Sequence, residues 1–288
     1  MQNFKNKTVH TPPYRTNYSE NSVGWAYLPN NSPHLNPPRP GREIAFTLAE
    51  VLITLVIIGV IAAITVPTLM NKIGDRQTVV ALKKAYTEIN QAFNLAQSEN
   101  GKISTWGLID EGGVNHTKLA QILKPYFKLM KICPSNEGPT CFAQTQYKNL
   151  AGDNWINGSN SDACTSAQTV DGKAISFEVF NYCGTDTSER FGSSPINSKI
   201  CADIFVDING AKKPNILGRD VFSFYLSDYG VVPRGTKMME SGTANLAKFS
   251  TDCNRNSSGY SCAGWVIYNE NMDYLHCDDL SWDGKLKC

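Results

Sequence analysis

Charged side chains are scarce in this chain, and neither sign dominates. Asp, Glu, Lys and Arg make up 18% of the 288 residues, and the formal net charge is +1. Attraction of nucleic acid or of an acidic substrate requires a concentrated positive field. We therefore expect neither as a partner.

Catalytic motifs are missing as well. The sequence has no Gly-x-Ser-x-Gly, no phosphate-binding Gly-x-x-x-x-Gly-Lys and no His-Glu-x-x-His. After residue 70 the only histidines are His116 and His276, and His276 is merely a sequence neighbour of Cys277. A Cys–His nucleophile needs the two side chains to face each other in space. We expect a protein that is not an enzyme and has no cofactor.

Cysteine is absent from the first 132 residues, and all nine cysteines lie from Cys133 to Cys288. Disulfides persist in oxidising compartments, so this placement predicts that the chain beyond residue 70 lies outside the cytoplasm. Zinc is not expected, because Cys-x-x-Cys spacing is absent. Sequence alone does not fix the connectivity. Close spacing favours the pairs Cys133–Cys141, Cys164–Cys183, Cys253–Cys262 and Cys277–Cys288, with Cys201 left over.

One long apolar run dominates the N-terminal third. From Val51 to Leu69 it carries no charge, and at about 1.5 Å per residue it matches the hydrocarbon thickness of a bilayer. Glu50 stands at its N-terminal edge, and Pro67 falls inside it. We expect residues 46–70 to form a transmembrane helix.

The helical pattern continues beyond the apolar run as an amphipathic segment, residues 71–100. Asn100-Gly101 is a typical helix end. The whole helix would be roughly 80 Å long. Its apolar side chains recur at helical spacing: Val79, Leu82, Tyr86, Ile89 and Phe93.

The first 45 residues have a different character. Residues 1–40 are rich in Asn, Pro, Ser and Thr and show no sustained apolar periodicity, so we expect a disordered leader. No charged start runs into a short apolar core with an Ala-x-Ala site, so this is not a secretory signal of the usual type.

The segment Phe46-Thr-Leu-Ala-Glu50, with basic residues before it and the apolar helix after it, resembles the N-terminus of type IV prepilins and type II secretion pseudopilins. The resemblance covers about residues 42–70. It implies that a prepilin peptidase cuts between Ala45 and Phe46, removes residues 1–45 and methylates the new amino group. Ala45 stands where the family usually has Gly.

The same resemblance implies an assembly role for Glu50, the fifth residue after the cut. Its carboxylate would pair with the Phe46 amino group of a neighbouring subunit. A second interpretation is local: Thr47 and Glu50 fit a capping box that satisfies free N–H groups of the first helical turn. Both can hold together. Pro67 is either a simple kink near the membrane exit or, as the resemblance implies, a weak point that stretches when filaments pack.

Residues 101–288 are expected to form an α+β head with an antiparallel sheet packed on the amphipathic half of the helix, a pilin-like arrangement stabilised by disulfides. A short helix is predicted over residues 115–130. Alternating apolar residues predict strands at 175–180, 204–208, 221–226 and 265–268.

One segment of the head, Asp207-Ile-Asn-Gly followed by Pro214-Asn and by Gly218-Arg-Asp220, resembles a recurrent pseudopilin segment. Asp207, Asn209 and Asp220 supply hard oxygen atoms, so Ca²⁺ is conceivable. The spacing is not that of an EF-hand, and a turn closed by Asx hydrogen bonds is the favoured interpretation.

The resemblance thus predicts a structural subunit of a type IV pilus or of a type II secretion pseudopilus. It would be stored as a single-pass inner-membrane protein with an extracytoplasmic head, and would polymerise with itself and with other pilins on an inner-membrane assembly platform. The alternative is a membrane-anchored binding or adhesion domain that never polymerises and tolerates a change at Glu50. An anchored enzyme, a third class, would show a deep pocket with perturbed titratable groups.

Overall fold

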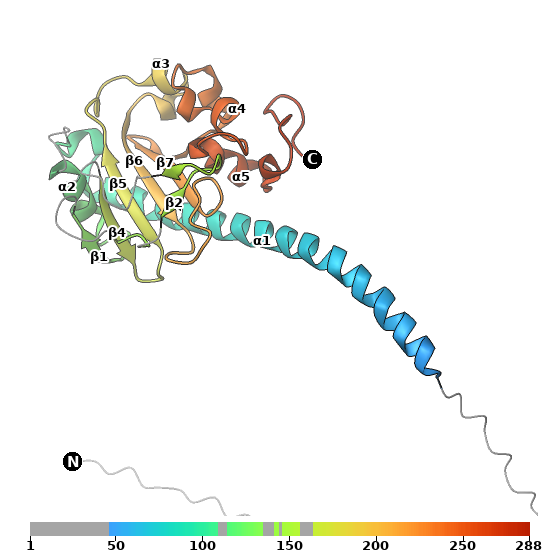
Figure 1. Ribbon diagram of the computed structural model, residues 1–288. Coiled ribbons are helices and arrows are strands. Elements are labelled where there is room, and N and C mark those ends of the chain that lie inside the picture. Colours follow the sequence, from blue (N-terminus) through green and yellow to red (C-terminus); the bar gives the residue numbers. More distant parts are fainter. Residues whose placement is uncertain (1–45, 109–113, 135–140, 144–145, 156–163) are drawn as a thin grey trace, which may run out of the picture. The chain divides into compact units, whose positions relative to one another are not determined.

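The structure, a computed structural model, describes residues 46–108, 114–134, 141–143, 146–155 and 164–288 (Figure 1). Internal contacts divide the chain into two units, residues 1–56 and 57–288. Ala45 and the leader predicted for residues 1–45 lie outside the described residues.

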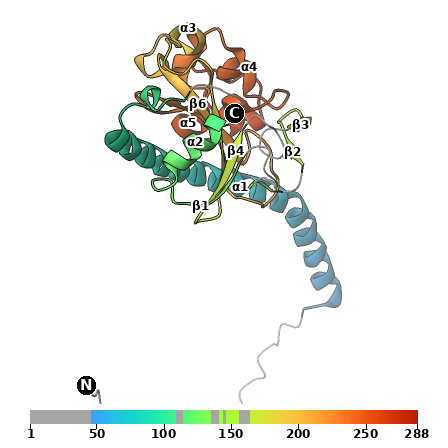
Figure 2. The same cartoon turned by 90° about the vertical axis from the view of Figure 1, so that its left-hand side faces the viewer.

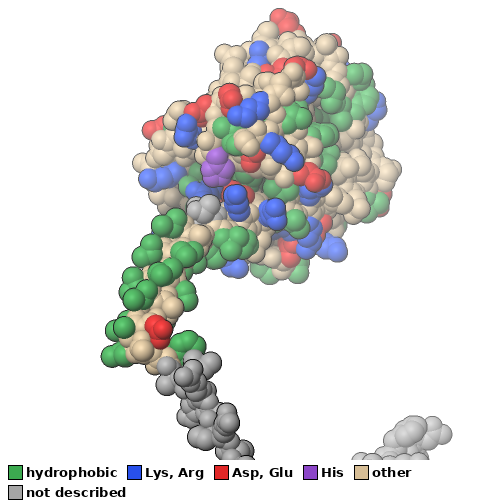
Figure 3. Space-filling model, turned by 90° about the vertical axis from the view of Figure 1, so that its right-hand side faces the viewer, with side chains coloured by type: hydrophobic (Ala, Val, Ile, Leu, Met, Phe, Trp, Pro, Cys, Tyr) green, Lys and Arg blue, Asp and Glu red, His purple; other side chains and the backbone are tan. Residues whose placement is uncertain are grey.

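The predicted long helix is α1, Leu48–Asn100, and it continues through Pro67. It ends where the sequence indicated: Gly101 adopts a left-handed φ of 80°, and its N–H donates to the Gln97 carbonyl at 2.9 Å. By length and composition α1 could cross a membrane, and none of its most apolar window is buried. Apolar side chains therefore cover the surface of its first half (Figure 3).

An antiparallel sheet forms the centre of the head, as predicted. Among the described residues it has six strands in the order β1-β4-β5-β6-β7-β8. Their bounds are Leu129–Cys133 (β1), Thr165–Thr169 (β4), Ala174–Val179 (β5), Ile200–Asp207 (β6), Val221–Ser227 (β7) and Gly230–Pro233 (β8). A separate pair joins β2, Tyr147–Lys148, to β3, Asn154–Trp155.

The second half of α1 lies across one face of this sheet (Figures 1 and 2). Tyr86 stacks on Phe224 of β7 with ring centroids 5.8 Å apart. The alternate residues of β7, such as Tyr225, face the other side, where the segments after β5 and β8 bury them. Because both faces are covered, every residue of β6 and β7 is buried. The α1 side chains in the core are Val79, Leu82, Ala85, Ile89, Phe93 and Ala96.

The remaining helices are short. The α-helices are α2, Val114–Leu123; α3, Ser188–Phe191; α4, Phe249–Asp252; and α5, Ala263–Asn269. The 3-10 helices are η1, Ile103–Thr105; η2, Pro195–Asn197; η3, Lys237–Ser241; η4, Asn245–Ala247; η5, Tyr260–Cys262; and η6, Asp273–Leu275.

Three of the predicted elements are wrong in extent or type. The strand predicted at 204–208 begins four residues earlier, since β6 is Ile200–Asp207. The helix predicted over residues 115–130 ends at Leu123, because Pro125 disfavours helical geometry at the residue before it, and Met130 lies in the edge strand β1. The strand predicted at 265–268 lies in α5. A four-residue apolar run does not distinguish a strand from a buried helical turn. Gly264 allows α5 to approach the segment after β8 closely, since a Cβ atom there would lie 2.6 Å from the Thr236 nitrogen. Its N–H donates to the Arg234 carbonyl at 2.8 Å.

Four disulfides join described residues in the head. Three are pairs that close spacing favoured: Cys133–Cys141, Cys253–Cys262 and Cys277–Cys288. The fourth joins Cys183 to Cys201, so the predicted Cys164–Cys183 pair is wrong.

The pairing of β5 with β6 explains the difference. The Phe180 N–H donates to the Cys201 carbonyl at 2.8 Å, and the Cys183 N–H donates to the Phe180 carbonyl at 3.1 Å. The turn after β5 thus returns Cys183 to the start of β6. Cys164 precedes β4, which pairs with the opposite edge of β5, and it takes part in none of the four bonds.

Candidate functional site

The first turn of α1 forms the predicted capping box. The Thr47 N–H donates to Glu50 Oε2 at 2.8 Å, and the Glu50 N–H donates to Thr47 Oγ1 at 3.2 Å. The Thr47 hydroxyl also donates to Glu50 Oε2 at 3.0 Å. Two free N–H groups of the helix start are therefore satisfied reciprocally. Phe46 immediately precedes this turn and is exposed.

Glu50 is exposed among apolar neighbours. Leu48, Val51 and Ile53 are each more than 40% exposed, and no ion pair of the described residues includes Glu50. Among the described residues, the hydrogen bonds to its carboxylate come from the uncharged partner Thr47. An anionic group in this setting remains open to a cation from outside.

Pro67 lies in the second half of the apolar run and has no N–H to donate to the helical ladder. Threonines elsewhere in the run direct their hydroxyls at carbonyl groups. Thr54 Oγ1 donates to the Val51 carbonyl and Thr65 Oγ1 to the Ile61 carbonyl, both at 2.9 Å. Such bonds are a usual way to satisfy backbone oxygen atoms in an apolar environment.

Asp207, Asn209 and Asp220 are brought together, as the sequence predicted. The Asn209 N–H donates to Asp207 Oδ1 at 3.2 Å, and Asn209 Nδ2 donates to Asp220 Oδ2 at 3.0 Å. Asp220 also accepts the N–H groups of Asn215 and Ile216, at 2.8 and 2.6 Å. These are the hydrogen bonds of a turn closed by Asx contacts. Calcium binding at this turn stays a prediction.

The buried Asp207 carboxyl is the most perturbed acid of this turn. Burial raises its pKa to about 7, although the Tyr147 hydroxyl donates to its Oδ2 at 2.6 Å. The nearby Asp220 carboxylate raises it further, and burial also raises the pKa of Asp220. Asp207 ties the β2–β3 pair, through Tyr147, to the end of β6.

A second buried polar cluster was missed by sequence analysis. Arg234 pairs with Asp203 of β6 at 2.7 Å, and both side chains are less than 10% exposed. The Ser223 hydroxyl donates to Asp203 Oδ1 at 2.6 Å, while Arg234 Nε donates to the Leu246 carbonyl at 2.9 Å. The guanidinium also lies 4.6 Å from the ring centre of Tyr260. An aspartate in the middle of an apolar strand was the available signal, since a buried charge requires a partner.

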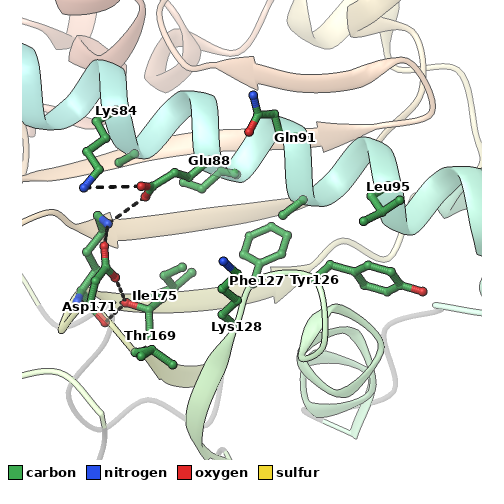
Figure 4. Close-up of a pocket in the computed structure, with 15 residues that line it drawn as sticks. Lys84, Glu88, Gln91, Leu95, Tyr126, Phe127, Lys128, Thr169, Asp171 and Ile175 are labelled. Carbon is green, nitrogen blue, oxygen red and sulfur yellow. Dashed lines mark hydrogen bonds and ion pairs between the residues drawn. The ribbon is translucent and has the colours of Figure 1, made fainter.

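A groove of about 580 Å³ runs beside α1 and was also missed (Figure 4). We call it the α1 groove. Its apolar floor is formed by Ala85, Ile89, Ala92, Phe127 and Ile175. Its charged rim is formed by Lys84, Glu88, Lys128, Asp171 and Lys173. One side of this groove is formed by α1 and the other by segments more than 30 residues away in the sequence. No local sequence motif therefore predicts the groove.

The head histidines have structural surroundings. His116 Nδ1 accepts the Val179 N–H at 2.9 Å, and His276 Nε2 lies 3.2 Å from Asp75 Oδ2 of α1. Cys277 is bonded to Cys288, so its sulfur is no thiolate beside His276. Within the part of the chain that the structure describes, no group of three or more His, Cys, Asp or Glu residues is arranged to hold a metal ion.

Comparison with family models, with curated proteins and with solved structures finds no match to this chain. The functional interpretation therefore depends on the residues and their geometry.

The buried ion pair gives the first prediction. Asp203→Ala leaves the Arg234 guanidinium buried without its counter-charge, and we expect the free energy of unfolding to fall by about 3–5 kcal/mol. The double variant Asp203→Leu/Arg234→Met removes both charges, so its free energy of unfolding should fall clearly less than that of the single variant. Urea unfolding measures both. Asp283→Ala, which breaks the exposed pair with Lys237, is the control and should cost less than about 1 kcal/mol. A double variant as damaged as the single would contradict this account.

Asp207 gives a pH prediction. Its pKa is raised from 3.8 to about 7 in the folded state, so the unfolded chain releases this proton first as pH rises. The contribution of Asp207 to stability is therefore highest below pH 4 and is lost as pH rises to about 7. The side chain of the Asp207→Asn variant cannot titrate. Between pH 4 and pH 8 its free energy of unfolding should therefore rise relative to that of the wild type by on the order of 3 kcal/mol. The measurement is urea unfolding across that range, with the exposed Asp153→Asn as control. A constant difference between the variant and the wild type would contradict the prediction.

Proposed function

We propose that this protein is a pilin-like structural subunit that is anchored by the first half of α1 and polymerises through it. The observation that carries the proposal is the two-part character of one helix. Its first half exposes apolar side chains with a single acid, Glu50, at the start, and its second half is built into the core of the head. Such a helix serves as anchor and scaffold at once.

The exposed half requires a cover. Val56, Ile58 and Ile64 are each more than 60% exposed, as are other large apolar residues of the same stretch. In a bilayer the lipid tails supply this cover, and in a filament the same helices of neighbouring copies supply it. The proposal assigns both environments to this half of α1 in succession.

Glu50 supplies the register of assembly in this proposal. An unpaired carboxylate near the membrane interior costs a few kcal/mol, roughly. Cleavage between Ala45 and Phe46 creates a new amino group four residues away, which is the missing cation. In a single chain the Glu50 carboxylate is satisfied by Thr47, so a neighbouring subunit would contribute the amine.

The head is assigned to the extracytoplasmic side. Its four disulfides support an oxidising compartment, and the cysteines all follow α1. The partners of the proposed subunit are copies of itself, other pilins or pseudopilins, a prepilin peptidase-methyltransferase and an inner-membrane assembly platform. The large head with its many cysteines favours a minor subunit over the main building block.

Processing is the first test. Co-expression with a prepilin peptidase should yield a membrane-extracted protein that begins at Phe46 and carries one added methyl group, because the small residue and the Phe-Thr-Leu-Ala-Glu segment are placed for that cut. Intact-protein mass spectrometry measures it. An intact leader, with the peptidase active on a control prepilin, would contradict the proposal and favour the anchored binding domain.

Assembly is tested separately. Glu50→Gln keeps the size of the side chain and an oxygen for the Thr47 hydrogen bonds but removes the charge, so we expect processing to continue and filament incorporation to fall about tenfold or more. Glu99→Gln is the matched control on the same helix, since its partner is the uncharged Tyr126 hydroxyl. Immunoblotting of sheared filaments measures incorporation. Equal incorporation of both variants would contradict the assembly role.

A further inference from the structure

We propose that the α1 groove binds an amphipathic anion: a fatty-acid-like molecule with one apolar chain and one carboxylate. The site lies entirely within residues 57–288, and the inference does not depend on polymerisation. It names a ligand class for the head that filament assembly does not require.

The floor of the groove suits an apolar chain. Ala85, Ile89 and Ala92 come from one side of α1, with Phe127 and Ile175 opposite, and no charged group lies on this floor. Ala85 and Ile89 are buried in the core of the head while still lining the groove. A volume of about 580 Å³ falls within the usual range of roughly 300–1,000 Å³ for small-molecule sites.

The charged rim of the groove favours a negatively charged ligand over a positively charged one. Lys173 is only 11% exposed and bonds both acids of the rim, Asp171 and Glu88, the latter at 2.9 Å. Burial alone would lower the pKa of Lys173, but its hydrogen bonds to the two carboxylates outweigh this and raise the pKa. Lys173 and Lys84, which also pairs with Glu88, together balance the charges of both acids. A cationic ligand would find no uncommitted carboxylate among the rim residues.

One ammonium group of the rim, that of Lys128, is left for an anion once Lys84 and Lys173 are counted against the two carboxylates. Lys84 is 3.6 Å from Glu88 Oε1, shares that acid with Lys173, and is 67% exposed. Lys128 forms no ion pair with any residue that the structure describes. Lysine ammonium groups at the edge of an apolar surface are suited to a carboxylate, because a charge-assisted hydrogen bond is about twice as strong as a neutral one.

The backbone holds Lys128 at the groove. Its φ is 50°, a conformation that residues other than Gly, Asn and Asp rarely adopt. Its carbonyl accepts the Val170 N–H at 3.2 Å, which fixes the segment against the β4–β5 turn. Figure 4 shows the Lys128 ammonium directed toward α1, beside the labelled Phe127. An uncommitted cation is thus aimed over an apolar floor.

The test uses the full chain in lipid nanodiscs and a dodecanoic acid that carries a photoreactive diazirine at the end of its chain. Trypsin cuts after Lys84 and Lys102, so residues 85–102 of the groove form one fragment, and the exposed apolar helix lies in another fragment that ends at Lys72. We expect saturable labelling of fragment 85–102 that unlabelled dodecanoate displaces and that dodecanol and dodecylamine do not. Labelling of the fragment ending at Lys72 measures simple partition into the bilayer.

Two variants and a control complete the test. Lys128→Glu should weaken labelling of fragment 85–102 about tenfold, since it removes a charged hydrogen bond. Ala92→Trp should block labelling by filling the floor. Lys131→Glu makes the same charge change at an exposed position of β1 outside the groove and should label like the wild type. Equal displacement by dodecylamine, unchanged labelling in Lys128→Glu, or labelling confined to the fragment ending at Lys72 would overturn the proposal. Lys128 is exposed, so its variant remains informative if Ala92→Trp fails to fold.

Discussion

On one face of the head's sheet the core is shared with α1, which packs there together with α2 and α5. Leu82, Ile89 and Phe93 are almost completely buried there, and Tyr86 stacks on Phe224 of β7. Each large apolar side chain so buried contributes about 1.5–3 kcal/mol relative to exposure. Without this helix, the apolar side chains that it covers, such as Phe224 of β7, would be exposed. The second half of α1 therefore belongs to the core of the head. An anchor on the first half of α1 would be continuous, through the same helix, with that core.

The opposite face of the sheet is organised differently. Alternation along β6 places Asp203 and Asp207 on that face, where each carboxyl is buried and engaged by a partner from elsewhere in the chain, Arg234 and Tyr147 respectively. Buried polar groups cost free energy unless they are paired, so these contacts specify which segments cover the face and in which position. On the α1 side, apolar packing stabilises the sheet. On the opposite side, the buried polar pairs also determine which segments cover the sheet.

Much of this could be predicted from the sequence, and the failures have physical reasons. The helix, its end at Gly101, the strands β5, β6 and β7 and the turn at Asp207 follow from local periodicity and turn chemistry. A strand is predicted in place of the α5 turn because a four-residue apolar run fits either element. Cys201 was left over because sequence distance, and not strand pairing, guided the choice. The Arg234–Asp203 pair and the α1 groove join segments far apart in the chain, which no local pattern reveals.

The change in periodicity along α1 also marks where its continuous apolar surface ends. Up to Leu69 the helix is apolar on every side, which is stable only where apolar matter surrounds it. Charges then appear at Lys72, Asp75 and Arg76, and beyond them apolar residues follow a single stripe. Asp75 also contacts the C-terminal segment, through His276. The head thus begins within about two turns of the point where the helix first tolerates charge. A head that began earlier would cover the apolar surface, and one that began later would leave an amphipathic stripe without its sheet.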